Sequence, residues 1–171
     1  MPKSDRPLIL VLCFSLLALA VAVADSLRDR VVRVGDTAPD FSVRADNGLT
    51  VSPKSFGGKV LVLNFWATWC PPCVEETPSL VAFAEAYREK GVVVLGVSVD
   101  KSQKNYENFI RRFRIGFLTS RDAEAKISDE YGTYIYPETY VIDRSGKVVQ
   151  KIVGKTDWTD ANMTRFIDSL L

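Results

Sequence analysis

Two apolar runs of strand length lie near the middle of the chain, at residues 60–66 and 92–99. Neither alternates between apolar and polar side chains, as a strand with one solvent-facing side does. Each run therefore predicts a strand buried on both faces, of the kind found in parallel sheets. Further along, Tyr140–Ile142 and Lys147–Val153 flank the turn-forming segment Asp143-Arg144-Ser145-Gly146, which predicts a hairpin.

Helical spacing fills the stretches between these strands. Residues 71–90 predict a long helix, which Pro78 is expected to kink because proline has no N–H to donate. Residues 104–114 predict an amphipathic helix with Phe109 on its apolar face, and shorter helices are expected over 124–131 and near the C-terminus. Alternating strands and helices, closed by a hairpin and a helix, predict an α/β sandwich.

The N-terminal part has a different pattern. Lys3 and Arg6 precede an unbroken stretch of apolar and small residues from Leu8 to Ala24, which has no polar face. A positive start, an apolar centre and a small-residue end are typical of an export signal. A stretch of about 17 residues also reaches the lower limit for a membrane-spanning helix. Residues 1–24 therefore predict either a signal peptide or an uncleaved signal-anchor transmembrane helix.

The remainder is expected to contain a linker over residues 25–33 and one domain over 34–171. Near the start of this domain, Asp46-Asn47-Gly48 is a hairpin-turn signal. Removing residues 1–24 takes Lys3, Arg6 and Asp5 from the 22 basic and 21 acidic residues, which leaves 20 of each. Proteins that bind nucleic acid usually carry an excess of positive charge, and this part of the chain has none, so no nucleic-acid partner is expected.

The candidate chemistry lies at the junction of the first buried strand and the long helix, where the sequence reads Cys70-Pro71-Pro72-Cys73. Free backbone N–H groups and the helix dipole stabilise a thiolate at such a helix N-terminus. Pro71 and Pro72 have no N–H, so the first amide able to reach the Cys70 sulfur is that of Cys73. The alternatives are a structural disulfide, half a zinc site, or chance. Zinc normally takes four ligands, and the chain has no histidine and no second cysteine pair.

Three motifs resemble the thioredoxin superfamily, and within it the exported ResA, TlpA and CcmG/DsbE group of cytochrome c maturation. They are Gly35-x-x-Ala38-Pro39-x-Phe41, Asn64-Phe65-Trp66-Ala67-Thr68-Trp69-Cys70-Pro71-Pro72-Cys73 and Pro137-Glu138-Thr139-Tyr140-Val141-Ile142-Asp143. The resemblance covers residues 34–171. It implies a thioredoxin-like α/β fold, with a central mixed sheet flanked by helices and an N-terminal β-hairpin extension.

The same resemblance implies roles for the residues around the dithiol. Cys70, expected at the exposed helix tip, should attack the target disulfide, and Cys73 should resolve the mixed disulfide. Trp69 is expected to shield the motif and offer a flat contact surface. A proton acceptor for Cys73 is implied at Glu76, because the exported group carries a glutamate three residues after the second cysteine. Cytoplasmic thioredoxins instead use a buried aspartate at the position of Asn64.

A second recurring element of thioredoxins is a cis-proline opposite the dithiol, and Pro137 matches it. The backbone of the preceding residue, here Tyr136, is expected to pair with an extended segment of the target. The following residue, Glu138, is expected to face the partner and help its recognition, as implied by the Pro-Glu-Thr sequence of the CcmG/DsbE branch.

The implied function is a membrane-tethered or periplasmic thiol–disulfide oxidoreductase that reduces protein disulfides, with apocytochrome c among the expected targets. A membrane thiol donor would re-reduce it, and the expected location is the extracytoplasmic face of the bacterial inner membrane. We expect no cofactor beyond the redox-active Cys70–Cys73 disulfide and no metal. The protein is expected to be a monomer.

Two alternative functions share parts of the pattern. The segment Ala38-Pro39-Asp40-Phe41 also occurs in peroxiredoxins, but Ala67 and Leu63 stand where those enzymes need a threonine and a proline. A Sco-type copper chaperone shares the fold and the N-terminal segment, but it uses a distant histidine as a ligand, and this chain contains none.

Overall fold

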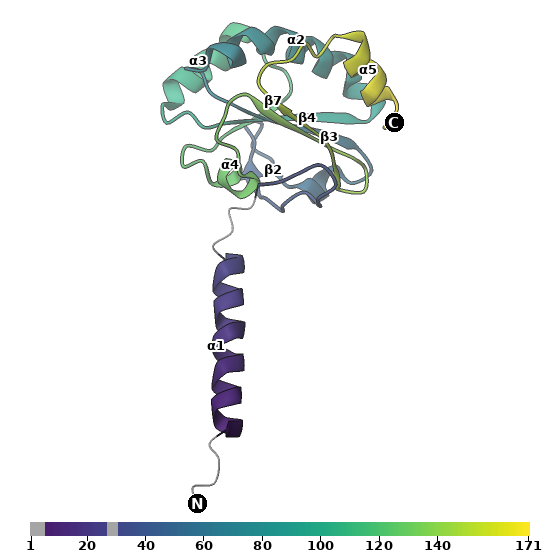
Figure 1. Ribbon diagram of the computed structural model, residues 1–171. Coiled ribbons are helices and arrows are strands. Elements are labelled where there is room, and N and C mark those ends of the chain that lie inside the picture. Colours follow the sequence, from purple (N-terminus) through teal and green to yellow (C-terminus); the bar gives the residue numbers. More distant parts are fainter. Residues whose placement is uncertain (1–5, 27–30) are drawn as a thin grey trace, which may run out of the picture. The chain divides into compact units, whose positions relative to one another are not determined.

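The computed structural model describes residues 6–26 and 31–171 of the chain (Figure 1). The chain divides into two compact units, Met1–Arg30 and Val31–Leu171. The first unit contains helix α1 (Arg6–Ser26) and the second contains all strands and the remaining helices of the described residues.

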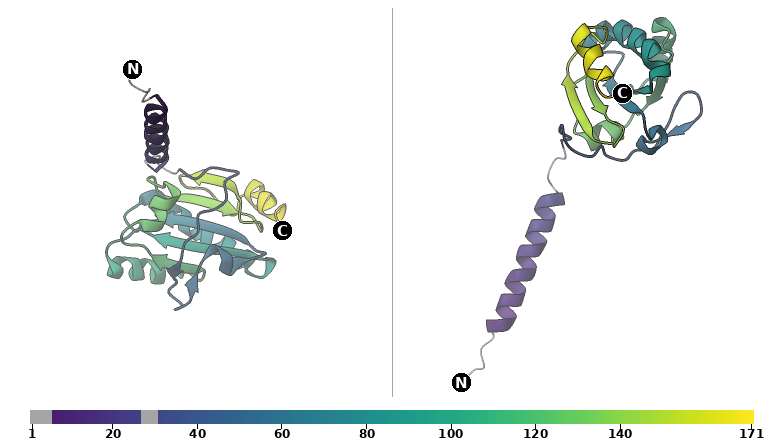
Figure 2. Two further views of the ribbon diagram at one scale, coloured as in Figure 1. Left: turned by 90° about the horizontal axis from the view of Figure 1, so that it is seen from below. Right: turned by 90° about the vertical axis from the view of Figure 1, so that its right-hand side faces the viewer.

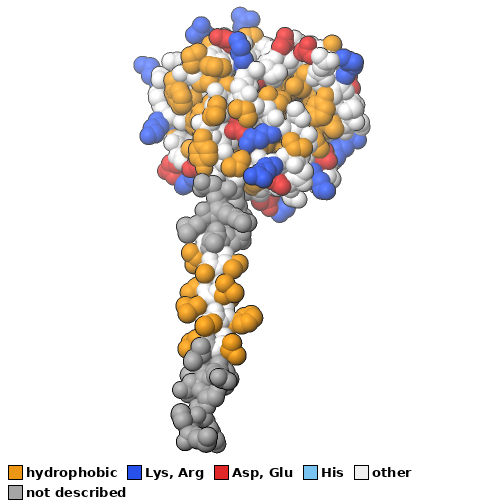
Figure 3. All heavy atoms as spheres, in the orientation of Figure 1, with side chains coloured by type: hydrophobic (Ala, Val, Ile, Leu, Met, Phe, Trp, Pro, Cys, Tyr) orange, Lys and Arg blue, Asp and Glu red, His pale blue; other side chains and the backbone are white. Residues whose placement is uncertain are grey.

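The face of helix α1 that Figure 3 shows carries mainly hydrophobic side chains. Leu10, Phe14 and Leu17 of this helix are exposed. Among the helices described, none is both long enough and apolar enough to cross a membrane. Lys3 of the predicted export signal and residues 27–30 of the predicted linker lie outside the described residues. The choice between a cleaved signal peptide and an uncleaved anchor remains a prediction.

The domain is built on a five-stranded mixed sheet with the strand order β5-β4-β3-β6-β7. Its central strand β3 (Val60–Trp66) runs parallel to β4 (Val92–Ser98), which in turn runs parallel to β5 (Leu118–Arg121). Strand β6 (Glu138–Ile142) is antiparallel both to β3 and to β7 (Val148–Val153). Every residue of β3 is buried, which explains why its sequence shows no alternation.

Longer helices cover one face of the sheet and shorter elements cover the other (Figures 1 and 2). The helical face carries α2 (Pro71–Tyr87), α3 (Gln103–Phe113) and α5 (Ala161–Asp168). The opposite face carries α4 (Lys126–Tyr131), the hairpin of β1 (Val43–Arg44) and β2 (Thr50–Val51), and the 3-10 helix η1 (Pro53–Phe56). A second 3-10 helix, η2 (Arg88–Lys90), follows α2.

The side chains of β3 alternate between two apolar cores, because successive residues of a strand point to opposite faces. Val60 and Val62 pack with Leu80 and Trp158 on the face covered by α2 and α5. Leu63 and its neighbours of the same parity pack on the other face, beneath α4 and the hairpin. The strand is thus held between two cores, and the dithiol follows directly at its carboxyl end.

The predicted α/β fold with its mixed sheet and N-terminal hairpin is confirmed. The strand over residues 60–66 has the predicted bounds, and the second strand ends one residue earlier than expected, at Ser98. The helix expected over 71–90 ends at Tyr87, and η2 continues the turn to Lys90. Pro78 lies inside α2.

Strand β5 was not predicted, and its composition explains the omission. Its sequence Leu-Thr-Ser-Arg has no apolar run and no apolar alternation. Thr119 and Ser120 are nevertheless buried, because the Thr119 hydroxyl donates to the Asp46 carboxylate and the Ser120 hydroxyl donates to the Arg44 carbonyl oxygen. Tertiary hydrogen bonds, rather than apolar pattern, place this strand at the edge of the sheet.

Candidate active site

The dithiol lies where β3 passes into α2. Cys70 is the N-cap of this helix, and its sulfur accepts a hydrogen bond from the Cys73 backbone N–H at 3.2 Å. Pro71 and Pro72 form the first turn, where a missing N–H breaks no helical hydrogen bond. The prediction that Cys73 supplies the first amide for the Cys70 sulfur is confirmed.

Cys70 and Cys73 form a disulfide, with their Cα atoms 5.3 Å apart. Only 4% of Cys70 and 2% of Cys73 is exposed, so the expectation that Cys70 sits at an exposed helix tip is wrong for this oxidised form. The cause is the packing around the helix start, where Trp66 and Ala67 join both cysteines in one apolar cluster. Little of Cys70 is therefore open to solvent in this form.

Trp69 lies at the surface beside the dithiol, with 65% of the residue exposed. Its ring meets that of Tyr136 edge-on at a centroid distance of 6.1 Å. Trp66, three residues earlier, is instead buried against Tyr106 and Phe109 of α3. The two tryptophans of the motif thus differ in their surroundings: Trp66 is buried and Trp69 is exposed.

The peptide bond between Tyr136 and Pro137 is cis, as expected for this fold. The Tyr136 carbonyl oxygen lies 3.3 Å from the Cys70 sulfur, which places this loop directly against the dithiol. Pro137 in turn accepts a hydrogen bond from the Gly154 N–H at 2.8 Å, so the end of β7 holds the loop in place.

Glu76 is buried one helical turn after Cys73, with 3% of the residue exposed. Burial raises the pKa of its carboxyl group to about 7, although hydrogen bonds from the Trp158 indole and the Thr156 backbone oppose this shift. Residues three apart share a helix face. The expected burial and raised pKa of Glu76 are thus present, and Trp158 is a site residue that the motif did not reveal.

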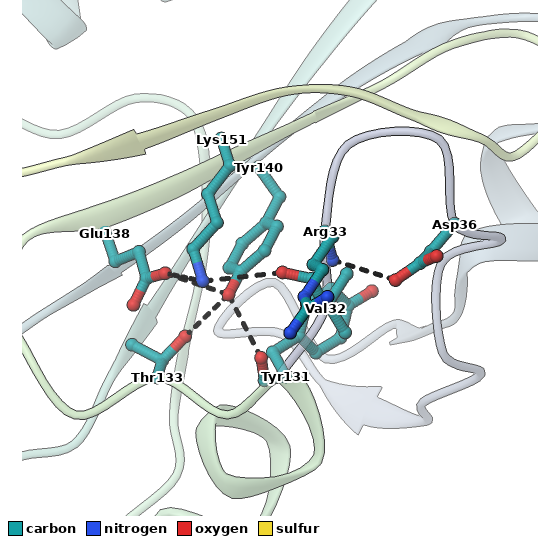
Figure 4. Close-up of polar contacts among 8 residues, drawn as sticks. All are labelled: Val32, Arg33, Asp36, Tyr131, Thr133, Glu138, Tyr140 and Lys151. Atoms are coloured by element: carbon teal, nitrogen blue, oxygen red, sulfur yellow. Dashed lines mark hydrogen bonds and ion pairs between the residues drawn. The ribbon is translucent and has the colours of Figure 1, made fainter. Parts of the chain in front are cut away.

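Glu138 does not face the partner side, and this corrects the sequence prediction. Only 3% of the residue is exposed, and its carboxylate lies 2.5 Å from the Lys151 ammonium (Figure 4). The Tyr140 hydroxyl also donates to this carboxylate at 2.9 Å. The physical reason is strand alternation, which points Glu138 to the same inner face as Tyr140.

A third buried acid, Asp100, supports the turn before the dithiol. Its carboxylate accepts hydrogen bonds from the Thr68 N–H at 2.9 Å, the Thr68 hydroxyl at 2.6 Å and the Ser98 hydroxyl at 2.6 Å. The sequence contained a usable signal, since Asp100 follows a predicted parallel strand and the carboxyl ends of such strands meet at one edge of the sheet. It ties the end of β4 to the segment that carries Trp69 and Cys70.

Two other polar side chains near the motif are accounted for. Asn64, at the position of the thioredoxin aspartate, is buried and donates a hydrogen bond to the Thr139 hydroxyl at 2.8 Å. Glu75 is an exposed acid that pairs with Lys155. Within the described residues, no cluster of three or more histidine, cysteine or acidic side chains could hold a metal ion.

Comparison with known proteins agrees with this geometry. The model of the AhpC/TSA family matches residues 34–151. The chain is 33% identical to the thiol–disulfide oxidoreductase ResA of Bacillus cereus over 159 residues, which covers 90% of this chain and 91% of that protein.

Solved structures show the same fold. A crystal structure described as the thiol:disulfide interchange protein DsbE of Chlorobium tepidum superposes with a TM-score of 0.75 at 29% identity, covering 81% of this chain and 98% of the other. Another thioredoxin-family thiol:disulfide interchange protein from Chlorobium tepidum gives a TM-score of 0.69 at 29% identity, with 82% and 99% covered. The chain therefore belongs to the AhpC/TSA family, within the thioredoxin superfamily, and is a thiol–disulfide oxidoreductase related to ResA.

Proposed function

We propose that this oxidoreductase reduces protein disulfides outside the cytoplasm and that cysteines of apocytochrome c are its targets. The carrying observation is the Cys70–Cys73 disulfide at the N-terminus of α2, with the Tyr136 carbonyl oxygen 3.3 Å from the Cys70 sulfur. A dithiol at this position can reduce a disulfide in an extended target segment that lies along Tyr136, and is itself oxidised to the Cys70–Cys73 disulfide.

In the first step, the Cys70 thiolate attacks one sulfur of the target disulfide. A Cys70–target disulfide forms, the target disulfide breaks, and the second target sulfur leaves as a thiolate. The Cys73 N–H, 3.2 Å from the Cys70 sulfur, stabilises the thiolate form together with the positive end of the α2 dipole.

In the second step, Cys73 gives up its proton and attacks the Cys70 sulfur, which releases the first target sulfur as a thiolate. Two electrons have then passed to the target, and Cys70 and Cys73 form the disulfide seen here. Glu76 is the proposed proton acceptor, because a carboxyl group whose pKa is about 7 can accept and return a proton near neutral pH.

The target is proposed to meet an apolar surface beside the dithiol. Trp69, Tyr134 and Ile135 are all largely exposed. Trp69 directly precedes Cys70, and Ile135 directly precedes Tyr136, whose carbonyl oxygen is 3.3 Å from the Cys70 sulfur. Apolar side chains on either side of a target cysteine would bury this surface, while the Tyr136 backbone pairs with the extended chain.

The proposed location follows from the N-terminal sequence. Lys3 and Arg6 before the apolar stretch support a location of the domain on the far side of the membrane from the cytoplasm. A reporter fused after Leu171 should be active outside the cytoplasm, and activity confined to the cytoplasm would contradict export. A membrane-bound full-length form indicates an anchor, whereas a released form starting at Asp25 indicates a cleaved signal. A membrane thiol donor is proposed to return electrons to the dithiol.

The decisive test of the reaction uses the purified domain and an oxidised apocytochrome c peptide. The wild type should reduce the peptide, and Glu76→Gln should slow reduction at pH 7 by roughly 10²-fold, the lower end of general acid–base effects. It should also remove the pH dependence near 7. Equal rates for the two proteins would remove Glu76 from the mechanism, and failure of the wild type on this peptide would remove apocytochrome c as the target.

A further inference from the structure

An ion pair lies behind the cis-proline loop, on the face of the sheet opposite α2. The Lys151 ammonium is 2.5 Å from the Glu138 carboxylate, and the two side chains are 19% and 4% exposed. Lys151 reaches Glu138 from the neighbouring strand. In the β6–β7 register Lys151 is opposite Tyr140 and therefore diagonal to Glu138. Its ammonium passes 5.0 Å from the centre of the Tyr140 ring (Figure 4).

The pair is part of a connected polar network. The Tyr140 hydroxyl contacts Glu138 at 2.9 Å, the Tyr131 carbonyl oxygen at 3.0 Å and the Thr133 hydroxyl at 3.2 Å. Lys151 also donates to the Val32 carbonyl oxygen at 3.4 Å. Each polar group is thus satisfied, as a buried network requires.

This network is joined through the chain to the loop beside the Cys70 sulfur. Glu138 is two residues along the chain from Tyr136, whose carbonyl oxygen lies 3.3 Å from the Cys70 sulfur. Water screens buried charges poorly, so a charge at Glu138 acts on a thiolate at Cys70 more strongly than a surface charge at the same distance.

The other titratable groups that face this region do not balance Glu138. Burial raises the pKa values of Tyr131, Tyr136 and Tyr140, so these phenols are neutral near pH 7. The remaining charged groups acting on Tyr136 are Asp122 and Asp129, which are also acids. Burial alone would lower the pKa of Lys151, but Glu138 and Tyr140 outweigh burial and raise it, so the ammonium stays charged.

We propose that Lys151 is a positioning residue for the redox reaction: it balances the charge of Glu138 behind the cis-proline loop and thereby sets the acidity of Cys70. An unbalanced carboxylate near Cys70 disfavours the thiolate, and an unbalanced ammonium favours it. The inference rests on the proposed function of the dithiol.

The test measures the thiol pKa of Cys70 in a Cys73→Ser background, by following its alkylation rate against pH. Lys151→Met should raise this pKa and Glu138→Gln should lower it, and at a pH well below the pKa each should change the thiolate fraction, and with it the alkylation rate, by about threefold or more. The double variant Lys151→Met/Glu138→Gln should return towards the parent value, because it restores charge balance. Lys151→Arg should behave as the parent.

Lys155→Met is the matched control, since Lys155 is another lysine in an ion pair, with Glu75, but that pair is exposed. It should leave the pKa of Cys70 nearly unchanged. Shifts of the same sign in both single variants, no shift in either, or a double variant that keeps a single variant's shift would overturn the inference. If Lys151→Met does not fold, Glu138→Gln and the double variant still decide the question.

Reduction of a protein disulfide by the parent with both cysteines is measured in parallel. If the parent reduces protein disulfides but the thiol pKa values of the variants do not change, only the role of Lys151 is contradicted, and the proposed function stands. A parent that reduces no protein disulfide contradicts the proposed function, whatever the pKa values show.

Discussion

Two glutamates lie on opposite faces of the sheet near the dithiol, and each residue is only 3% exposed. The groups that contact their carboxylates differ. Glu76, on the α2 side, meets the indole N–H of Trp158 and a backbone N–H. Glu138, on the other side, meets the ammonium of Lys151 and the hydroxyl of Tyr140.

The difference shows that burial alone does not decide what a carboxyl group can do. Neutral donors compensate Glu76 only partly, so desolvation prevails and its pKa rises to about 7. Glu138 instead has the full opposite charge of the Lys151 ammonium at 2.5 Å. One glutamate is suited to proton transfer and the other to charge balance.

The largest expected effect comes from removing the cysteine that Glu76 is proposed to serve. Cys73→Ala should reduce turnover to the background rate and accumulate a mixed disulfide between Cys70 and the target, because no resolving thiol remains. Cys70→Ala should also be inactive but should trap nothing. Non-reducing gel electrophoresis with an oxidised target distinguishes the two, and equal trapping by Cys70→Ala would mean that the attacking cysteine is misassigned.

Breaking the pair on the other face should chiefly cost stability. Lys151→Met leaves the Glu138 carboxylate buried without its cation and should lower the free energy of unfolding by about 3–5 kcal/mol. Lys151→Met/Glu138→Gln removes both charges and should lose clearly less. Urea unfolding at pH 8 measures both variants. Losses of equal size would show that packing of the lysine chain, rather than charge, is what matters.

The raised pKa of Glu76 predicts a pH-dependent stability of the opposite sign from that of a salt-bridged acid. The unfolded chain loses this proton near pH 4.5 and the folded protein near pH 7, so the folded state binds more protons between these values. Stability should therefore fall as pH rises through this window, by about 3 kcal/mol from this group.

Glu76→Gln tests whether Glu76 causes the predicted fall in stability between about pH 4.5 and pH 7. It keeps an acceptor for the Trp158 N–H but cannot ionise, so its oxidised form should lose less stability between pH 4.5 and 7 than the wild type. Unfolding free energies across this range measure the difference. Parallel pH profiles for the two proteins would show that Glu76 ionises in the fold at its ordinary pKa.

The smallest expected effect concerns the exposed apolar surface that includes Ile135, in contrast to the two buried glutamates. Ile135→Ser should raise KM for a protein target by roughly tenfold, the value of one buried aliphatic side chain, while reduction of a small-molecule disulfide changes little. Leu49→Ser is the control, because Leu49 is 61% and Ile135 62% exposed, and Leu49 lies in the N-terminal hairpin. Equal effects on both substrates would show that this surface does not select targets.

Local signals in the sequence were sufficient for the outline of the fold and for the dithiol. An unbroken apolar run is difficult to place anywhere but in a strand covered on both faces, and Asp46-Asn47-Gly48 is a strong turn signal. The two prolines after Cys70 dictate which amide can reach its sulfur, whatever surrounds the motif. These features depend on neighbours within a few residues, so they can be read along the chain.

The partners of the buried acids could not be read in this way. Trp158 lies 82 positions from Glu76, and Lys151 reaches Glu138 only because the β6–β7 register sets it opposite Tyr140. A glutamate at the start of a strand has the same local pattern whether it faces a partner or the core. The sequence by itself determined the dithiol, its strand and its helix. Only the tertiary structure decided which glutamate is left without a cation, because that depends on which distant side chain fills the space beside it.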